Sequence, residues 1–533
     1  MEPSGRLELT WTNKHLRLIS DPEGGYEWVD PTDPRVSEVR LLHEIATVGD
    51  DARDGGNLLI EGDALHALTA LNRIPELAKR YAGQVRLVYI DPPFNTGQAF
   101  ANYDDNLEHS VWLSMLRDRL VQIKPLLAPN GSIWVHLDDA EVHRCRCVMD
   151  EILGAANFVA TVVWEKASGA RGDTDISASH DFLLVYAADR AIWRHERNLL
   201  ERTEGQLSRY ANPDDDPRGP WRQGADGSAK SGSDALRFPI TLPSGRVVTP
   251  PAGNYWRFTE SRFQLARAEG RVYFGRRGDS LPVIKTYLSE AKQGVVPRTW
   301  WPASEVGSNQ EAKRDHLRKL FPDVEPFATP KPERLMERII HIASDPGDLV
   351  LDCFAGSGTT AAVGQKMGRR WVTSEREADT IERFTRPRLE KVVKGEDPGG
   401  ITAAVGWTGG GGFEHLRVGP SMFDLDAETG DVFLAGWATN GAFSEAVAAQ
   451  LGFERSDAPP FCGRKGRTRL AVLDGVVGAA EVEFLVAALD ERERVVVVGQ
   501  AFTEDAESTL RALSPGSRVR HAPHDLLRRR GRR

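Results

Sequence analysis

The sequence predicts an α/β protein built on a mostly parallel, doubly wound sheet. Short apolar strands alternate with helical patterns over residues 57–187, and the alternation resumes over residues 333–374. Strands that are joined through helices run parallel and are covered by helices on both faces. Aspartates and glycines directly follow several of these strands, which predicts a ligand site at the carboxyl edge of the sheet.

Hydrophobic periodicity defines the elements of both halves. Apolar and aromatic runs between turn formers predict strands, and apolar residues three and four apart predict helices. In the first half we predict strands at 57–62, 85–90, 132–137 and 182–187, helices at 64–74 and 112–127, and a turn at 129–131. In the second half we predict helices at 333–343 and 359–367, and strands at 349–353 and 370–374.

The segment between the two halves has a different composition. Residues 211–233 are turn formers and charges, which predicts a loop. Residues 255–277 interleave six Arg with six aromatic residues, and Lys313, Arg314, Arg318 and Lys319 follow. This mixture suits a surface that binds phosphates and stacks on bases. It suits equally well a small subdomain whose Arg stems cover its own core.

The last part of the chain predicts a linker and a smaller α/β segment. Residues 407–413 (WTGGGGF) are rich in glycine, as linkers and tight loops are. Beyond them, a helix is predicted near 444–451 and strands near 470–473 and 495–498.

Composition narrows the class of protein. The 533 residues are 40% hydrophobic, which is ordinary for a soluble chain of several domains. The net charge of −9 argues against a protein that coats nucleic acid, but one basic groove remains compatible with it. No apolar run reaches the roughly 20 residues that span a bilayer, and no signal peptide is recognisable, so we expect a cytoplasmic protein. The four Cys form no CxxC pair, and we expect reduced thiols and no metal site.

A glycine-rich turn is predicted between the strand 349–353 and the helix 359–367. The stretch DCFAGSGTT from Asp352 to Thr360 contains two glycines, which let a ligand approach the backbone at a helix N-terminus. It lacks the lysine of a phosphate P-loop and the third glycine of a dinucleotide fingerprint. Glu375 ends the next strand, where an acid binds ribose hydroxyls. These features predict an adenosine ligand without a pyrophosphate, and the alternative is a plain strand–helix turn.

The tetrapeptide Asp91-Pro92-Pro93-Phe94 follows the strand 85–90. The rigid Pro-Pro step places the Asp91 carboxylate beside the Pro92 carbonyl, which gives two acceptors for the two hydrogens of an exocyclic amine. Phe94 offers a flat face to the ring that bears the amine, at roughly 1–3 kcal/mol per stacked base. The alternative is a type I or II turn with a buried Phe.

These motifs carry a family resemblance. DPPFNTG upstream of DCFAGSGTT resembles S-adenosylmethionine-dependent DNA amino-methyltransferases of the β group, in which the catalytic motif precedes the cofactor motif. The blocks NLLIEGDALHAL, GSIWVHLDD and FATPKPERLMERII are similar to the modification subunit of type III restriction systems. The resemblance covers about residues 40–415 and implies a Rossmann-like methyltransferase with circularly permuted motif order. The usual tyrosine of the tetrapeptide is Phe94 here, which keeps the stacking ring.

The resemblance implies a role for each motif. Asp91, Pro92, Pro93 and Phe94 would hold an adenine flipped out of duplex DNA, whose N6 amine is methylated directly. S-adenosylmethionine would lie along the glycine loop, with Glu375 at its ribose, Asp63 at its adenine edge, and Thr329 and Lys331 near its carboxylate. The full set of expected cofactor contacts is Asp63, Thr329, Lys331, Asp352, Phe354, Ala355, Gly356, Ser357, Gly358, Thr359 and Glu375. The expected DNA contacts are Arg257, Arg262, Arg276, Arg277 and Lys285.

The same resemblance implies a division of the chain and its partners. The expected segments are an N-terminal extension (1–40), a catalytic half (41–195), a target-recognition region (196–325), a cofactor-binding half (326–405), and a C-terminal α/β domain for assembly or partner docking (406–533). Double-stranded DNA is the expected substrate, within a restriction-modification or other phage-defence system. Candidate partners are a nuclease–helicase subunit, another defence protein, or a second copy of the chain.

Other functions stay open at this point. Cytosine N4 methylation uses an amine of similar geometry, but those enzymes usually carry Ser at the position of Asp91. A mainly DNA-binding assembly subunit is a second alternative. A nicotinamide dehydrogenase is disfavoured by the missing third glycine.

Overall fold

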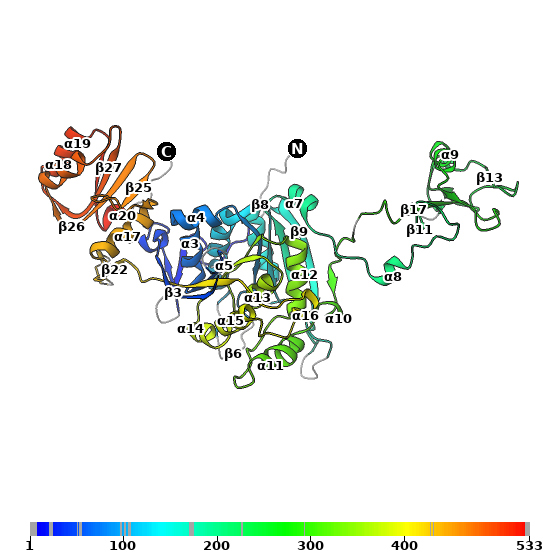
Figure 1. Cartoon of the computed structure of the whole chain (residues 1–533), viewed down its shortest axis with the longest axis horizontal. Coiled ribbons are helices and arrows are strands. Elements are labelled where there is room, and N and C mark those ends of the chain that lie inside the picture. The colour runs from blue at the N-terminus through cyan, green and yellow to red at the C-terminus, as the bar shows by residue number, and fades with distance from the viewer. Residues whose placement is uncertain are drawn as a thin grey trace. The chain divides into compact units, whose positions relative to one another are not determined.

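The computed structural model describes residues 8–20, 25–50, 52, 56–95, 99–100, 103–104, 108–169, 175–224, 227–292, 294–426, 428–429 and 431–527. The chain divides into two compact units (Figure 1). The larger one comprises Met1–Asn198 with Arg298–Arg533, and the smaller one comprises Leu199–Pro297. No helix within the described ranges is long and apolar enough to cross a membrane.

The larger unit is built on a ten-stranded sheet in the order β18-β9-β10-β8-β5-β19-β20-β4-β21-β3. The strands from β8 to β21 in this order pair in parallel, whereas β10 is antiparallel to both of its neighbours and β3 is antiparallel to β21. The prediction of a mostly parallel α/β sheet is therefore confirmed. The strands are β3 (Leu42–Gly49), β4 (Leu58–Glu61), β5 (Val85–Ile90), β8 (Leu127–Leu137), β9 (Phe158–Glu165), β10 (His180–Ala187), β18 (Trp300–Trp301), β19 (Leu349–Asp352), β20 (Arg370–Glu375) and β21 (Gly412–Val418).

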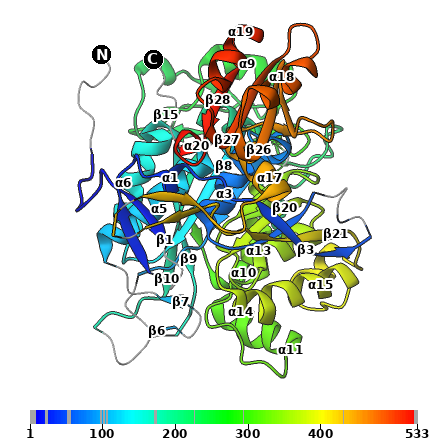
Figure 2. The ribbon, with the colours of Figure 1, turned by 90° about the vertical axis from the view of Figure 1, so that its left-hand side faces the viewer.

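Helices cover both faces of this sheet. Leu58 and Ile60 of β4 pack in one core with α3 and α5, whereas Leu59 between them packs in another core with α13 and α15. Figures 1 and 2 show α3 and α15 on opposite sides of the strand layer. The helices are α3 (Ala64–Arg73), α4 (Pro75–Tyr81), α5 (His109–Ile123), α6 (Val142–Met149), α7 (Arg190–Glu196), α10 (Ala303–Val306), α11 (Arg318–Leu320), α12 (Glu333–Ala343), α13 (Thr359–Lys366), α14 (Ala378–Thr380), α15 (Arg386–Lys394) and α16 (Thr402–Val405). The π-helical turns are η2 (Asp150–Gly154), η5 (Glu311–Leu317) and η6 (Ile381–Thr385), and the 3-10 turns are η1 (Lys124–Leu126) and η3 (Ala155–Asn157).

Local patterns located most of these elements but missed some. β5 and α12 begin and end at the predicted residues. The predicted turn at 129–131 is wrong, because β8 continues through it. Val85 lies opposite Leu127 and Leu87 lies opposite Ser132, so the extra residues bulge out of the strand. The edge strand β3, which we did not predict, is mostly exposed or half-buried and has little apolar periodicity.

The terminal segments complete the larger unit. Residues 8–20 pack on α5, where Trp11 Nε1 donates to Ser114 Oγ at 2.7 Å. Part of the expected C-terminal domain joins the main sheet as β21, and a separate five-stranded sheet follows in the order β24-β25-β26-β27-β28. The elements of these terminal segments are β1 (Arg17–Ser20), β2 (Tyr26–Val29), α1 (Pro34–Ser37), β22 (Phe423–Leu425), β23 (Val432–Leu434), α17 (Asn440–Leu451), β24 (Glu454–Arg455), β25 (Gly463–Lys465), β26 (Thr468–Val477), α18 (Ala479–Ala487), β27 (Arg494–Phe502), α19 (Ala506–Leu513), β28 (Arg518–His521) and α20 (His524–Leu527). Two short strands, β6 (Ala99–Phe100) and β7 (Tyr103–Asp104), pair with each other between β5 and α5.

The smaller unit has its own aromatic core. Trp256, Phe258 and Phe263 are buried, and the ring of Phe258 stacks on the other two. Of the two alternatives for this segment, these three side chains agree with the subdomain core, because they fill it. The elements are α8 (Glu204–Leu207), β11 (Trp221–Gln223), β12 (Ser228–Ala229), η4 (Asp234–Leu236), β13 (Ile240–Thr241), β14 (Val247–Val248), β15 (Tyr255–Trp256), α9 (Glu260–Ala268), β16 (Val272–Tyr273) and β17 (Val283–Tyr287). Residues 298–325, which we predicted in the target-recognition region, lie in the larger unit, and the predicted division of the chain by function stays a prediction.

Candidate active site

Two of the predicted motifs meet at one cavity of about 670 Å³. The strands β5, β19 and β20 are neighbours and run parallel, so the loops after their carboxyl ends converge. The predicted residues that line the cavity are Asp91, Pro92, Pro93, Phe94, Thr329, Lys331, Asp352, Phe354, Ala355, Gly356, Ser357, Thr359 and Glu375. Gly358 does not line it but adopts a left-handed conformation as the N-cap of α13. A volume of this size is typical of a small-molecule site.

Asp91 has one oxygen paired and one unpaired. The ammonium of Lys331 lies 2.5 Å from Asp91 Oδ2. Asp91 Oδ1 is buried and has no hydrogen-bond partner among the described residues. Trp112 Nε1 donates to the Pro93 carbonyl at 2.6 Å and so holds the Pro-Pro step in place. Because a buried acceptor without a donor is unfavourable, the unpaired oxygen indicates a ligand that donates a hydrogen bond there.

Phe94 presents its ring to the cavity and rests on a buried polar network. The ring lies 5.6 Å from the His136 ring at an angle of 33°, and the Lys331 ammonium lies 5.2 Å from its centre. His136 Nε2 donates to the Asp181 carboxylate at 3.3 Å, and its Nδ1 shares a hydrogen bond with the Tyr89 hydroxyl at 2.8 Å. Burial lowers the pKa of His136, despite Asp181, which favours the neutral ring. We did not predict this network. The one local sign of it in the sequence is His136, a histidine within the apolar strand β8.

The glycine loop leaves space that a side chain would fill. Gly356 has φ +48°, and a Cβ placed there would lie 3.3 Å from the Phe327 ring. Its N–H donates to Glu375 Oε2 at 2.8 Å, which joins the loop to the end of β20. Burial, and to a smaller extent the charges of Asp91 and Glu375, raise the pKa of Asp352 to about 7. An accumulation of acids in one cavity favours a ligand that carries positive charge.

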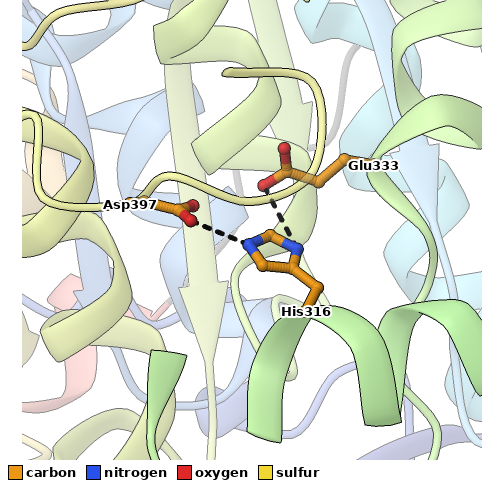
Figure 3. A group of neighbouring side chains, drawn as sticks. All are labelled: His316, Glu333 and Asp397. Atoms are coloured by element: carbon orange, nitrogen blue, oxygen red, sulfur yellow. Dashed lines mark hydrogen bonds and ion pairs between the residues drawn. The ribbon is translucent and has the colours of Figure 1, made fainter. Parts of the chain in front are cut away.

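A buried cluster of charged side chains includes His316, Glu333 and Asp397 (Figure 3). His316, Glu333 and Asp397 place atoms that could bind a metal within 4.8 Å of one another. The Lys366 ammonium, however, lies 2.8 Å from Glu333 and 2.7 Å from Asp397, and Arg388 lies 2.8 Å from Glu333. These two cations already neutralise the carboxylates, so we interpret the cluster as a network of ion pairs.

Arg388 connects this network to the cavity. Its guanidinium donates to the Ser357 carbonyl at 3.3 Å and to Thr359 Oγ1 at 2.8 Å. Thr359 Oγ1 in turn donates to the Lys331 carbonyl at 3.4 Å. Through these bonds Glu333 and Arg388 hold both the glycine loop and the segment that carries Lys331. Sequence reasoning missed Arg388, because no local pattern indicates a contact with residues about thirty positions away.

Asp63 lies outside the cavity lining. Its carboxylate accepts from the Leu65 N–H at 2.7 Å as the N-cap of α3, and Arg119 binds both of its oxygens at 2.8 and 2.9 Å. Burial would raise the pKa of Asp63, but Arg119 and the other partners lower it to about 2. The structure gives Asp63 the role of a helix cap, and the predicted contact with a cofactor stays a prediction.

The expected DNA contacts fall into two groups. Arg257, Arg262, Arg276 and Arg277 are exposed on the smaller unit. Lys285 is buried, and its ammonium lies 2.5 Å from Asp214 and 2.6 Å from Asp216. An ammonium enclosed by two carboxylates cannot reach a phosphate without breaking both ion pairs, so the prediction for Lys285 is corrected to a structural role.

Comparison with known proteins agrees with this arrangement. Residues 85–386 match the family model described as DNA methylase, which groups N6 and N4 methyltransferases. The chain belongs to the DNA methylase family. The matched range contains both motifs of the cavity and the whole smaller unit.

Curated relatives of this DNA methylase include Mod subunits of type III restriction-modification enzymes and a type II methyltransferase. It is 29% identical over 70% of its length to the type III restriction-modification enzyme StyLTI Mod subunit of Salmonella typhimurium, of which the match covers 62%. It is 28% identical over 69% of its length to the probable type III HindVI Mod subunit of Haemophilus influenzae, of which the match covers 55%. It is 26% identical over 57% of its length to the type II methyltransferase M.EcaI of Enterobacter cloacae, of which the match covers 63%. The chain thus spans between about half and two thirds of each relative.

Proposed function

We propose that this DNA methylase transfers a methyl group from S-adenosylmethionine to the N6 amine of adenine in duplex DNA. The observation that carries the proposal is the unpaired Asp91 Oδ1, buried in the wall of the cavity that also contains the glycine loop. An exocyclic amine is a donor of the kind that this acceptor lacks. Phe94 lies next to it along the chain and lines the same cavity, where a flat ring can stack.

The residues of the loop fit S-adenosylmethionine. Gly356 leaves a space beside Phe327 that a Cβ would occupy, and Glu375 lines the cavity as an acceptor for ribose hydroxyls. Carboxyl groups outnumber lysines in the cavity lining, which favours a positively charged ligand. The cofactor carries a sulfonium and an ammonium, so its charge complements this cavity.

The mechanism follows from the acceptors. The amine of adenine is a weak nucleophile, because its lone pair is delocalised into the ring. Asp91 Oδ1 and the Pro92 carbonyl accept its two hydrogens and favour a pyramidal nitrogen with a localised lone pair. Lys331 holds the other Asp91 oxygen and fixes the carboxylate. When bound, S-adenosylmethionine supplies the electrophilic methyl group, and the surplus proton of the amine leaves through Asp91 to solvent.

Most of the acceleration of methyl transfer in such a site comes from holding the amine and the methyl group in position. Holding nucleophile and acceptor in line is worth up to about 7–11 kcal/mol in well-aligned systems. A base inside a duplex cannot reach this cavity, so the adenine flips out at a cost of a few kcal/mol.

The smaller unit is the proposed target-recognition region. Arg257, Arg262, Arg276 and Arg277 are exposed there and are available to phosphates or base edges. Replacing residues 199–297 with those of a relative should transfer the relative's methylation motif. An active chimera that keeps the original motif would assign recognition elsewhere. The restriction subunit of the relatives' systems is the partner we propose, with the C-terminal sheet as its docking site.

Methylation of defined DNA tests the proposal. The purified chain is incubated with labelled S-adenosylmethionine and unmethylated genomic DNA, and the products are separated as nucleosides. We expect N6-methyladenine, and native-DNA sequencing would give the motif. N4-methylcytosine in its place would assign the alternative amine, and no label in either base would refute the proposal. The Asp91→Asn variant, which keeps the shape of the side chain, serves as the control.

A further inference from the structure

A second hollow of about 350 Å³ adjoins the catalytic cavity. The two share three lining residues, Asn309, Lys313 and Ala328. The remaining lining includes Arg314, Arg318 and the carboxylate of Glu325. We call this hollow the basic mouth, because cations outnumber the single carboxylate of its lining.

Two of these cations are unengaged. Arg314 pairs with the neighbouring Asp315 at 2.9 Å. Within the part of the chain that the structure describes, the side chains of Lys313 and Arg318 have no hydrogen-bond or ion-pair partner. Asn309 Oδ1, where the two hollows meet, is likewise buried without a partner among the described residues. Two cationic donors and one acceptor oxygen that lack partners among the described residues therefore lie in the lining of the same hollow.

A π-helical turn brings the two free cations together. In a regular α-helix, residues five apart do not share a face. In η5, the Arg318 N–H donates to the Lys313 carbonyl, which is the i→i+5 bond of a π-helix and places the two residues one above the other. On the buried side of the turn, His316 Nε2 donates to the Asp397 carboxylate at 2.9 Å (Figure 3). The turn is thus anchored to the same ion-pair network that holds the glycine loop.

Electrostatics explains why a cationic rim is needed here. Five carboxyl groups line the catalytic cavity, from Asp91, Asp138, Asp181, Asp352 and Glu375, against three ammonium groups, from Lys166, Lys313 and Lys331. An acidic cavity repels the phosphates on either side of a nucleotide that enters it. Cations at the rim offset that repulsion where the backbone must pass.

We propose that the basic mouth binds the phosphodiester backbone next to the base that enters the catalytic cavity. Lys313 and Arg318 are the phosphate contacts, and the amide of Asn309 contacts the flipped nucleotide at the junction. This inference rests on the proposed function, since it names the part of the DNA strand that this rim holds. It also assigns a DNA contact to the larger unit, outside the residues 199–297 proposed for recognition.

The salt dependence of DNA binding tests the basic mouth. The full chain, the double variant Lys313→Gln/Arg318→Gln and the control Lys319→Gln are compared by fluorescence anisotropy with duplex DNA at several salt concentrations. Lys319 is exposed, next to Arg318, and lines neither hollow. Each lost phosphate contact lowers the slope of log affinity against log salt by about 0.9. We expect the slope to fall by about 1.8 in the double variant and to stay unchanged in the control.

Two further measurements separate this inference from the proposed function. Calorimetry should give the same S-adenosylmethionine affinity for the double variant and the wild type, and thermal melts should agree within about 2 °C. A slope equal to that of Lys319→Gln, or a parallel loss of cofactor binding, would overturn the basic mouth even if adenine is methylated. If the double variant shows the expected change in slope but the wild-type chain transfers no methyl group, the proposed function alone is refuted.

Discussion

Replacing Phe94 separates a stacking platform from a residue that merely fills the core. Phe94 is half-buried, packs against the main core on one side and lines the cavity on the other. We expect Phe94→Ala to reduce methyl transfer strongly while the protein remains folded. Phe94→Tyr, which keeps the flat ring, should remain active.

The expected loss of stability and the expected loss of methyl-transfer rate can be estimated separately for Phe94→Ala. A fully buried Phe→Ala change costs about 3–5 kcal/mol of the free energy of unfolding. Because Phe94 is only half-buried, we expect roughly half of that cost, about 1.5–2.5 kcal/mol. A protein with about 5–15 kcal/mol of stability stays folded after such a loss. Removing one stacked base contact costs about 1–3 kcal/mol, which is about 5- to 150-fold in rate.

The assay combines thermal melts with methylation rates measured well below the melting temperature. Phe94→Leu is the matched variant, because it keeps apolar volume and removes the flat face. We expect Leu to melt close to wild type and to be nearly as inactive as Ala. Activity within twofold of wild type in Phe94→Leu would refute the platform and favour a core residue.

Three more substitutions test the other parts of the cavity. Asp91→Ala should abolish methyl transfer and leave S-adenosylmethionine affinity within about threefold by calorimetry, because the carboxylate faces the amine; a tenth of the wild-type rate would contradict this assignment. Gly356→Val should weaken cofactor binding at least about 100-fold, since φ is +48° and the side chain would meet Phe327; an unchanged dissociation constant would count against the loop. Burial raises the pKa of Asp352 to about 7, so the protein is more stable at low pH, where this carboxyl is neutral. The contribution of Asp352 to the free energy of unfolding, at most about 4 kcal/mol, is lost as pH rises through 7. Asp352→Asn should therefore narrow the difference in melting temperature between about pH 5 and about pH 8, and an undiminished difference would exclude Asp352 as its source.

The sequence by itself determined the elements and motifs that depend on nearby residues. β5 and α12 were predicted to the residue, because a continuous apolar run and a periodic apolar face are local patterns. The motifs DPPF and FAGSG were assigned to one site, because parallel strands end at the same edge of a sheet. The lining of the cavity contains both.

Tertiary structure alone decided which charges meet. Lys331 and Asp91 are 240 residues apart, and their ion pair depends on how the two halves interleave in the sheet. Lys285 and Arg318 are both basic residues near the middle of the chain, yet one is enclosed by two aspartates and the other is exposed beside the cavity. Composition cannot distinguish them, because the cost of burying a charge is offset only by partners that folding brings into contact.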